Sequence, residues 1–398
     1  MRAIGYAAVG LMCIAACATT GDDPPDVSPS PDVPHDDGGS PADDAGAATD
    51  GRPPPVDLDA EKALVCGDSG YCETRLPTSS WGEPLSLRAV WMVDPNDVWS
   101  VTEEGVVLHW DGNQWSISYQ GNHPLYAIWA TRTSVWAAGQ GGNLLRRGEG
   151  NSWSRVETNH IGTIRAIYGT ADDDVWITRG DGGVDHFDGT SLQTQTFDIP
   201  NLEITTVFGR EGFGTYVAGY VKGPVPDDRY ATVPHVPWVR GLTGADVTEF
   251  DLSFSQAQGV VPVAGAVTNS PDATQRVALS GYLERFVKDD GKFAIADLRY
   301  IIAGKDGVVR ATSYGNPTTV LGQRIEPPPI LPLWTRDWTD VRFPFHFAQI
   351  LTWNGVDEKR SSIDMGYDFV PRKIFGIQGD ATVMWLVGDG FAVRGGAP

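Results

Sequence analysis

Two short segments combine a histidine, an aromatic residue and an aspartate, which are residue types that bind metals and sugars. They are His109-Trp110-Asp111 and His186-Phe187-Asp188, and a glycine follows each aspartate. Asp-Gly is also a strong turn former, because glycine accepts positive φ and the aspartate side chain caps its own turn. The segment belongs to a repeat, so we expect its copies on different sheets, far apart. They are therefore predicted to be structural rather than ligands.

The common catalytic patterns are missing from the sequence. It contains no Gly-x-Ser-x-Gly elbow, no His-Glu-x-x-His and no glycine-rich phosphate loop leading into a helix. A carboxylate pair for glycoside hydrolysis cannot be recognised in a repeat protein from spacing alone. We therefore name no catalytic residue, metal ligand or cofactor, and whether the chain is an enzyme stays open, with a non-enzyme favoured.

The chain contains four cysteines, and two of them lie close together in CGDSGYC. An even pair in an exported protein predicts a disulfide, here between Cys66 and Cys72. A redox or zinc motif would need a different spacing of paired ligands. The expected bond would pin the loop where the folded domain begins.

The N-terminus predicts export. Arg2 precedes an apolar run that is too short for a membrane span, which is typical of a signal peptide over residues 1–16. Ile14-Ala15-Ala16-Cys17 resembles the bacterial lipobox, which implies that Cys17 carries the lipid and becomes the mature N-terminus. Ala18 then implies the outer membrane. The alternative is an ordinary secretory signal in which Cys17 is incidental.

Residues 17–62 are predicted to be a disordered, acidic, proline-rich tether. Positions 18–62 hold twelve acids and two bases, a net charge of −10, and almost no branched apolar residue. Such a segment cannot bury enough surface to fold. The whole chain has 51 acidic and 30 basic residues, and this balance argues against a nucleic-acid partner, because phosphate contacts need clustered Lys and Arg.

The stretch from Leu87 to Trp115 is the first copy of a repeat. The aromatic residue that ends its first segment recurs at Trp129, Tyr168 and Phe208, at intervals of 38, 39 and 40 residues from Trp91. A fixed period near 40 with four strand-like segments per unit is the mark of a β-propeller blade. We therefore predict an all-β propeller over residues 63–398.

The ends of the repeat region predict how the ring closes. The last unit, residues 373–394, has three strand-like segments and lacks the fourth. An unpaired Ser80-Trp81 precedes the first copy, so we expect residues near 72–85, including Trp81, to complete the last blade and remove an open sheet edge. Thr352–Gly355 then belongs to the penultimate blade. Leu298–Gly304 is expected to be an inner strand. Seven blades result, or eight if residues 298–372 form two.

The repeat pattern, with Leu-x-Ala-Val/Ile-Trp, Asp-Val-Trp and His-Trp/Phe-Asp-Gly, resembles propeller repeats of surface lipoproteins from myxobacteria and their relatives. It is also similar to the tectonin-type repeats of some lectins. The resemblance covers residues 87–189 and 373–394. It implies a propeller, with a binding or scaffold role at a membrane and an unidentified protein or glycan partner.

Two insertions interrupt the repeat, at 210–237 and 315–345. Long loops on a rigid ring often carry function, so we take their polar and aromatic residues as candidate ligand contacts. These are Tyr230, His235, Trp238, Trp334, Arg336 and Trp338. The alternative is that the insertions plug the ring or cover a sheet edge. A carbohydrate-binding or glycan-active propeller is the second hypothesis. It needs aromatic platforms on one face and, for catalysis, a close carboxylate pair, and charged side chains that converge in one axial pocket would favour it.

Overall fold

The computed structural model describes residues 65–228, 231–242, 250, 252, 257–269, 275–287, 292–304, 307–315, 332–345, 349–363 and 373–396. The chain divides into two compact units, residues 1–61 and 62–398. The predicted signal peptide, Cys17 and the whole of the predicted tether lie outside the described residues. In the described part of the chain, no helix is long and apolar enough to cross a membrane.

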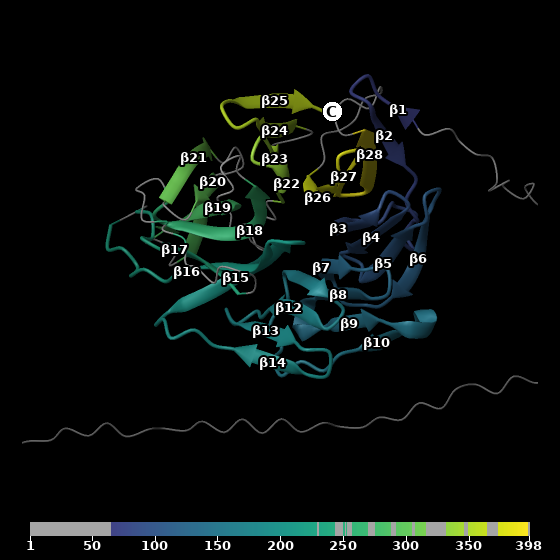
Figure 1. The fold of residues 1–398 in the computed structure, drawn as a ribbon, viewed down its shortest axis with the longest axis horizontal. Coiled ribbons are helices and arrows are strands. Elements are labelled where there is room, and N and C mark those ends of the chain that lie inside the picture. Colours follow the sequence, from purple (N-terminus) through teal and green to yellow (C-terminus); the bar gives the residue numbers. More distant parts are fainter. Residues whose placement is uncertain are drawn as a thin grey trace, which may run out of the picture. The chain divides into compact units, whose positions relative to one another are not determined.

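The second unit is an all-β propeller of seven antiparallel sheets arranged in a ring (Figure 1). The described residues contain no α-helix, only two short 3-10 turns, η1 (Gln140–Gly142) and η2 (Glu149–Asn151). The prediction of seven blades is therefore confirmed, and the alternative of eight is wrong. Each of the first six blades is a meander in which consecutive strands pair.

The first three blades follow the repeat segment by segment. Blade 1 contains β3 (Leu87–Asp94), β4 (Asp97–Thr102), β5 (Val106–Trp110) and β6 (Trp115–Gln120). Blade 2 contains β7 (Leu125–Ala130), β8 (Val135–Gly139), β9 (Leu144–Arg147) and β10 (Trp153–Arg155). Blade 3 contains β11 (Ile167–Ala171), β12 (Asp174–Thr178), β13 (Val184–Phe187) and β14 (Leu192–Gln195).

The next three blades keep the architecture with less regular sequence. Blade 4 contains β15 (Leu202–Arg210), β16 (Gly214–Val221) and β17 (Val236–Gly241). Blade 5 contains β18 (Val260–Asn269), β19 (Gln275–Val287), β20 (Lys292–Gly304) and β21 (Gly307–Gly315). Blade 6 contains β22 (Trp334–Asp337), β23 (Asp340–Phe345), β24 (Gln349–Trp353) and β25 (Glu358–Ser362).

Two expectations about this region need correction or refinement. Leu298–Gly304 is not an inner strand but the end of β20, the third strand of blade 5, whose first strand is β18. The prediction was wrong because β19 and β20 are long apolar strands, and apolar content alone does not order strands within a sheet. Trp353 ends β24, so Thr352–Gly355 lies in the penultimate blade, as predicted.

The seventh blade joins the two ends of the propeller. It contains β26 (Ile374–Gly379), β27 (Val383–Gly388) and β28 (Phe391–Gly396), and then β2 (Tyr71–Thr74) and β1 (Val65–Cys66) from the other end of the chain. Cys72 pairs with Arg394 across the β2–β28 ladder. Closure by an N-terminal strand is therefore confirmed, and the ring is held shut by backbone hydrogen bonds.

The predicted disulfide is present, and the predicted role of Trp81 is wrong. Cys66 and Cys72 are bonded, with an S–S distance of 2.06 Å, and link β1 to β2. Trp81 lies outside the seventh blade, in a turn, and is 89% exposed. The residue that β2 brings to the blade 1 boundary is instead Thr74, whose buried hydroxyl accepts a hydrogen bond from Trp115 Nε1 at 2.9 Å.

Neighbouring blades pack through the aromatic residue of the inner strand. A Cβ built on Gly169, Gly209 or Gly265 would meet the ring of Trp129, Tyr168 or Phe208, respectively, at 2.2–2.9 Å. Each ring therefore lies against a glycine of the following blade, a contact that a larger residue would block. This contact explains why the aromatic residue recurs with the blade period.

Candidate functional site

The two His-aromatic-Asp segments are structural, and their histidines belong to a repeated packing unit. In blade 1, Asp97 Oδ1 accepts a hydrogen bond from Trp99 Nε1 at 2.7 Å. The same oxygen lies 2.9 Å from His109 Nε2. The His109 ring stacks on Trp99 with centroids 4.1 Å apart. We call these three residues the outer module of blade 1.

Blade 3 repeats the outer module with nearly the same geometry. Asp174 Oδ1 contacts Trp176 Nε1 at 2.9 Å and His186 Nε2 at 2.7 Å, and the His186 and Trp176 rings stack at 4.1 Å. The carboxylate satisfies both ring nitrogens that face it, so the histidine is held by its own blade. Among the described residues, no cluster of three or more His, Cys, Asp or Glu could hold a metal ion.

Two of the ligand contacts predicted in the first insertion are buried. Trp238 lies in β17 and packs edge-to-face on Phe197 with centroids 5.1 Å apart. His235 is 3% exposed; its Nδ1 accepts a hydrogen bond from the Gly223 amide at 3.2 Å and its Nε2 lies 3.1 Å from Glu284. Tyr230 lies outside the described residues.

The predicted contacts of the second insertion belong to blade 6. Trp334 begins β22 and donates a hydrogen bond to the Gly379 carbonyl of blade 7 at 2.9 Å. Trp338, which is buried, packs edge-to-face on Trp353 at 6.1 Å. Arg336 is half-exposed and lies 3.3 Å from Asp340. The two tryptophans thus serve the packing of the ring, and the described candidates do not meet at one site.

A different row of residues does converge. Five inner strands carry a β-bulge at the same position, the variable residue of the Leu-x-Ala segment. In blades 1, 2, 4, 5 and 7 the bulged residues are Arg88, Tyr126, Thr205, Val263 and Phe375. Arg165 holds the same sequence position in blade 3, where the amide of Arg165 donates to Thr178 Oγ1. We call these six residues the axial row.

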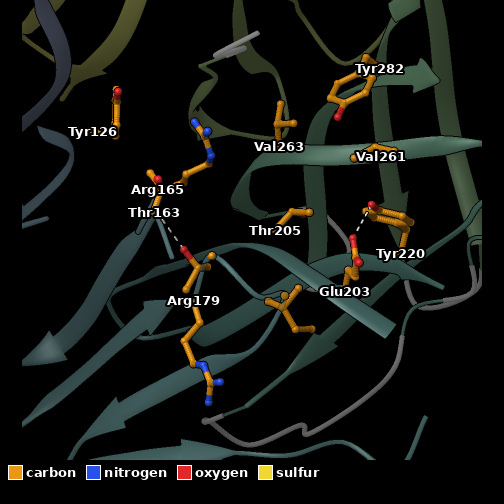
Figure 2. A pocket seen from close by; sticks show the side chains of 14 residues that line it. Tyr126, Thr163, Arg165, Arg179, Glu203, Thr205, Tyr220, Val261, Val263 and Tyr282 are labelled. Atoms are coloured by element: carbon orange, nitrogen blue, oxygen red, sulfur yellow. Dashed lines mark hydrogen bonds between the residues drawn. The ribbon is translucent and has the colours of Figure 1, made fainter. Parts of the chain in front are cut away.

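Four residues of the axial row line a cavity of about 210 Å³ (Figure 2). Tyr126, Arg165, Thr205 and Val263 come from four consecutive blades, 2 to 5, and Tyr220 and Tyr282 contribute from β16 and β19. In Figure 2 the Arg165 guanidinium extends into the open centre, whereas the Arg179 guanidinium points away from it. The cavity therefore lies where the inner strands begin, at the axis that the blades share.

Arg165 carries a cation without a carboxylate partner among the described residues. Its guanidinium lies over the Tyr126 ring, 5.6 Å from the centroid. Partial burial lowers its pKa, and the only groups that counter this shift are the hydroxyls of Tyr126 and Tyr282. The residue remains exposed to the cavity. It is the arginine of the lining that is free to meet a ligand, since Arg179 pairs with Asp181 and Asp185.

Arg88 is the matched counter-example in the same row. It forms an ion pair with Glu103, and its guanidinium lies 4.2 Å from the centroid of the Phe375 ring. Its side chain is only 16% exposed. Equivalent backbone positions in blades 1 and 3 therefore carry one arginine whose charge is satisfied within the protein and one whose charge faces solvent.

The opposite wall of the cavity carries the carboxylate of Glu203. Tyr220 donates its hydroxyl to Glu203 Oε2 at 2.6 Å, and Lys222 pairs with Oε1. Burial raises the pKa of Tyr220 and of Tyr282 well above the usual tyrosine value. Both hydroxyls therefore stay protonated at neutral pH. His235 packs edge-to-face on Tyr220 at 4.5 Å, so this predicted contact supports the cavity from behind.

Sequence reasoning missed the cavity, although a signal was present. The variable position of the Leu-x-Ala segment reads Arg88, Tyr126, Arg165 and Thr205 in the first four copies. Polar residues at a position between two apolar ones indicate a face that does not enter the core. Only the bulge shows that this face turns to the axis.

Comparisons with known proteins agree on the fold. No family model and no curated protein sequence matches the chain. Among solved structures, the chain resembles YCF48 bound to a D1 peptide (TM-score 0.54, 11% identity, 84% of this chain and 100% of that one). The WD40 repeats of RRP9 give a TM-score of 0.56 at 9% identity, covering 84% and 99% of the two chains. Virginiamycin B lyase from Staphylococcus aureus gives 0.52 at 11%, covering 81% and 98%. These identities establish a β-propeller and nothing finer.

Proposed function

We propose that this protein is an exported, lipid-anchored binding propeller that presents its axial cavity to a ligand. The observation that carries the binding role is the convergence of polar side chains from four consecutive blades on one cavity. Ligand sites are concave, mostly apolar and lined by a few placed polar groups, and here apolar walls from β18 surround Arg165 and the tyrosine hydroxyls. The structural neighbours include a propeller bound to a peptide and a lyase. Their different functions on one fold support the idea that the side chains of the site, and not the fold, determine what a propeller does.

A cavity-filling substitution tests the binding role. Val263→Trp places a large ring in the cavity from a half-buried position, and Val225→Trp, at an exposed site 53% accessible, is the matched control. Ligand-observed NMR with a mixture of sugars, amino acids and short peptides should show binding to the native protein and to Val225→Trp, and none to Val263→Trp. Equal signals from both variants would place binding elsewhere.

The proposed anchor rests on the sequence of the N-terminus. Three features coincide in register there: the apolar run, the small residues Ala15 and Ala16, and Cys17. Two or more acyl chains on one cysteine give stable membrane attachment where one chain does not. The acidic, proline-rich residues 18–62 would then hold the propeller away from the membrane surface.

Metabolic labelling with palmitate tests the anchor. The Cys17→Ala variant should lose the label, and Cys13→Ala, within the same apolar run, should keep it. Separation of inner and outer membranes then locates the labelled protein, which we expect in the outer membrane. Label retained in Cys17→Ala would exclude lipidation at this residue and favour an ordinary secretory signal.

A further inference from the structure

The corner of the cavity around Arg165 has the chemistry of an oxyanion receptor. Two hydrogen-bond donors face it, the Arg165 guanidinium and the Tyr126 hydroxyl, whereas Tyr282 packs with Tyr220 on the other side of the cavity (Figure 2). Neither the guanidinium nor the Tyr126 hydroxyl has a hydrogen-bond or ion-pair partner among the residues that the structure describes. A planar guanidinium with free donors matches a carboxylate or phosphate oxygen pair.

The charge around this corner selects among oxyanions. One free cation faces the cavity, whereas Glu203 lines the opposite wall and Glu284 lies near Tyr282. A single positive charge can balance a monoanion but not the second charge of a phosphate dianion, and Lys222 already pairs with Glu203 on the opposite wall. The corner therefore favours a carboxylate over a phosphate.

The opposite wall selects the rest of the ligand. Glu203 already accepts one hydrogen bond at each oxygen, from Tyr220 and Lys222, and each oxygen keeps a second acceptor site. Lys222 balances the charge of Glu203, so neutral hydroxyl donors suffice on this side. The cavity of about 210 Å³ lies below the range of about 300–1,000 Å³ that is usual for drug-sized ligands, so a single small ring fits better than a long chain.

We propose that the axial cavity binds a uronic acid, a sugar ring whose carboxylate meets Arg165 and Tyr126 and whose hydroxyls bond to Glu203 and to the Tyr282 hydroxyl on the opposite wall. This assignment rests on the proposed binding function and gives its ligand class. The tyrosine rings supply the apolar surface that sugar rings pack against. The sugar is either free or the terminal residue of an acidic glycan.

Titration calorimetry of the full-length protein with galacturonate and glucuronate tests the assignment. Galactose and glucose serve as neutral isosteres, and N-acetylalanine and inorganic phosphate serve as carboxylate and phosphate probes without a sugar ring. At least one uronate should bind about tenfold or more tightly than its neutral isostere, because a hydrogen bond to a charged group is worth more than a neutral one. Equal affinity for uronate and neutral sugar, or tighter binding of N-acetylalanine or phosphate, would overturn the proposal.

Two arginine variants assign the effect to the corner. Arg165→Gln should weaken uronate binding about tenfold or more and leave the affinity for the neutral sugar unchanged. Arg88→Gln is the control, at the equivalent sequence position but paired with Glu103, and should keep native affinity. Tyr282→Phe, which removes only a hydroxyl, should weaken binding less than Arg165→Gln. Identical uronate affinity in native protein and Arg165→Gln would overturn the assignment.

The outcomes separate this assignment from the proposed function. If the NMR mixture binds to native protein and not to Val263→Trp, while uronates fail in calorimetry, the cavity is a binding site for another ligand. If a terminal uronate is the natural ligand, an oligogalacturonate should bind at least as tightly as the monosaccharide. Weaker binding of the oligomer would restrict the site to free sugars.

Discussion

The outer modules and the axial row occupy the same blades but vary in opposite ways. Blades 1 and 3 keep Asp, Trp and His in the outer module, with stacked rings at 4.1 Å in both. The axial row keeps a backbone bulge in five of its six positions and changes its side chain from blade to blade. The outer module has the same geometry in blades 1 and 3, so it serves a packing need that these two blades share. The axial row places a different side chain in each blade, so several kinds of side chain can contact one ligand at the axis.

The largest expected effect tests the equivalence of the two outer modules. Trp99→Ala and Trp176→Ala each remove a buried indole and leave a cavity, so each should lower the free energy of unfolding by about 3–5 kcal/mol. Chemical denaturation of the two variants measures this. If one variant loses free energy of unfolding within the range of about 3–5 kcal/mol and the other falls outside it, the two modules are not equivalent.

The next effect tests the shared carboxylate. Asp97→Ala leaves Trp99 Nε1 and His109 Nε2 without their acceptor, at a cost of about 1–3 kcal/mol. Asp174→Ala should cost somewhat more, because Asp174 also accepts a hydrogen bond from the Thr170 hydroxyl. A double-mutant cycle of Asp97→Ala with His109→Ala isolates the pair. Full additivity in that cycle would deny the coupling.

A smaller effect contrasts the two arginines of the axial row. Arg88→Gln removes the ion pair with Glu103 and the contact with Phe375, so we expect a loss of about 1 kcal/mol or less. Arg165→Gln should leave the free energy of unfolding unchanged within about 0.5 kcal/mol, because its charge has no carboxylate partner in the described structure. Thermal unfolding of both variants compares them. The reverse order of stabilities would assign Arg165 a structural role.

The smallest effect concerns the turn that follows each outer module. Asp188 accepts hydrogen bonds from the amides of Thr190 and Ser191 and from the Thr190 hydroxyl, which lower its pKa to about 2. Its contribution to stability is therefore present above the unfolded pKa of 3.8 and is lost as the pH falls through about 2. The stability difference between native protein and Asp188→Asn should shrink as the pH falls from about 5 to about 2.

The pH measurement also has an internal comparison in blade 1. Asp111 occupies the same turn and its carboxylate accepts hydrogen bonds from the amides of Gln114 and Asn113, which lower its pKa as well. Asp111→Asn should therefore show the same direction of pH dependence as Asp188→Asn. A stability difference that stays constant with pH in both variants would contradict the assigned hydrogen bonds.

Much of the fold was predictable because its determinants are local. The aromatic residues at 38–40-residue intervals pack against glycines of the next blade, so their spacing reports the blade length. The missing fourth segment of the last unit predicted closure from the N-terminal side. The prediction was wrong about which residues form the closing strand. Trp81 was expected to belong to it, but β2 ends at Thr74 and Trp81 is exposed. Strand pairing between ends more than 300 residues apart depends on register, which residue type alone does not specify.

The candidate site was less predictable. The six residues chosen from the insertions were selected for residue type, and the tryptophans among them are buried in the ring. Trp238, Trp334 and Trp338 show how weak an indicator an aromatic residue is when its strand is not yet placed. That the six residues contact a ligand stays a prediction. Leu298–Gly304 was misplaced for a related reason, since an inner and a third strand have similar apolar content.

By itself, the sequence determined the blade period, the all-β class, the disulfide pair and the structural nature of the His-aromatic-Asp segments, because each depends on contacts within one blade or between adjacent blades. Only the tertiary structure decided which residues meet at the axis. Tyr126, Arg165, Thr205 and Val263 are about 40 residues or more apart along the chain, and closing the ring turns these side chains toward one cavity. The same closure brings Phe375 of blade 7 against Arg88, whose ion pair with Glu103 lies within blade 1, whereas Arg165 faces the cavity with no carboxylate partner among the described residues.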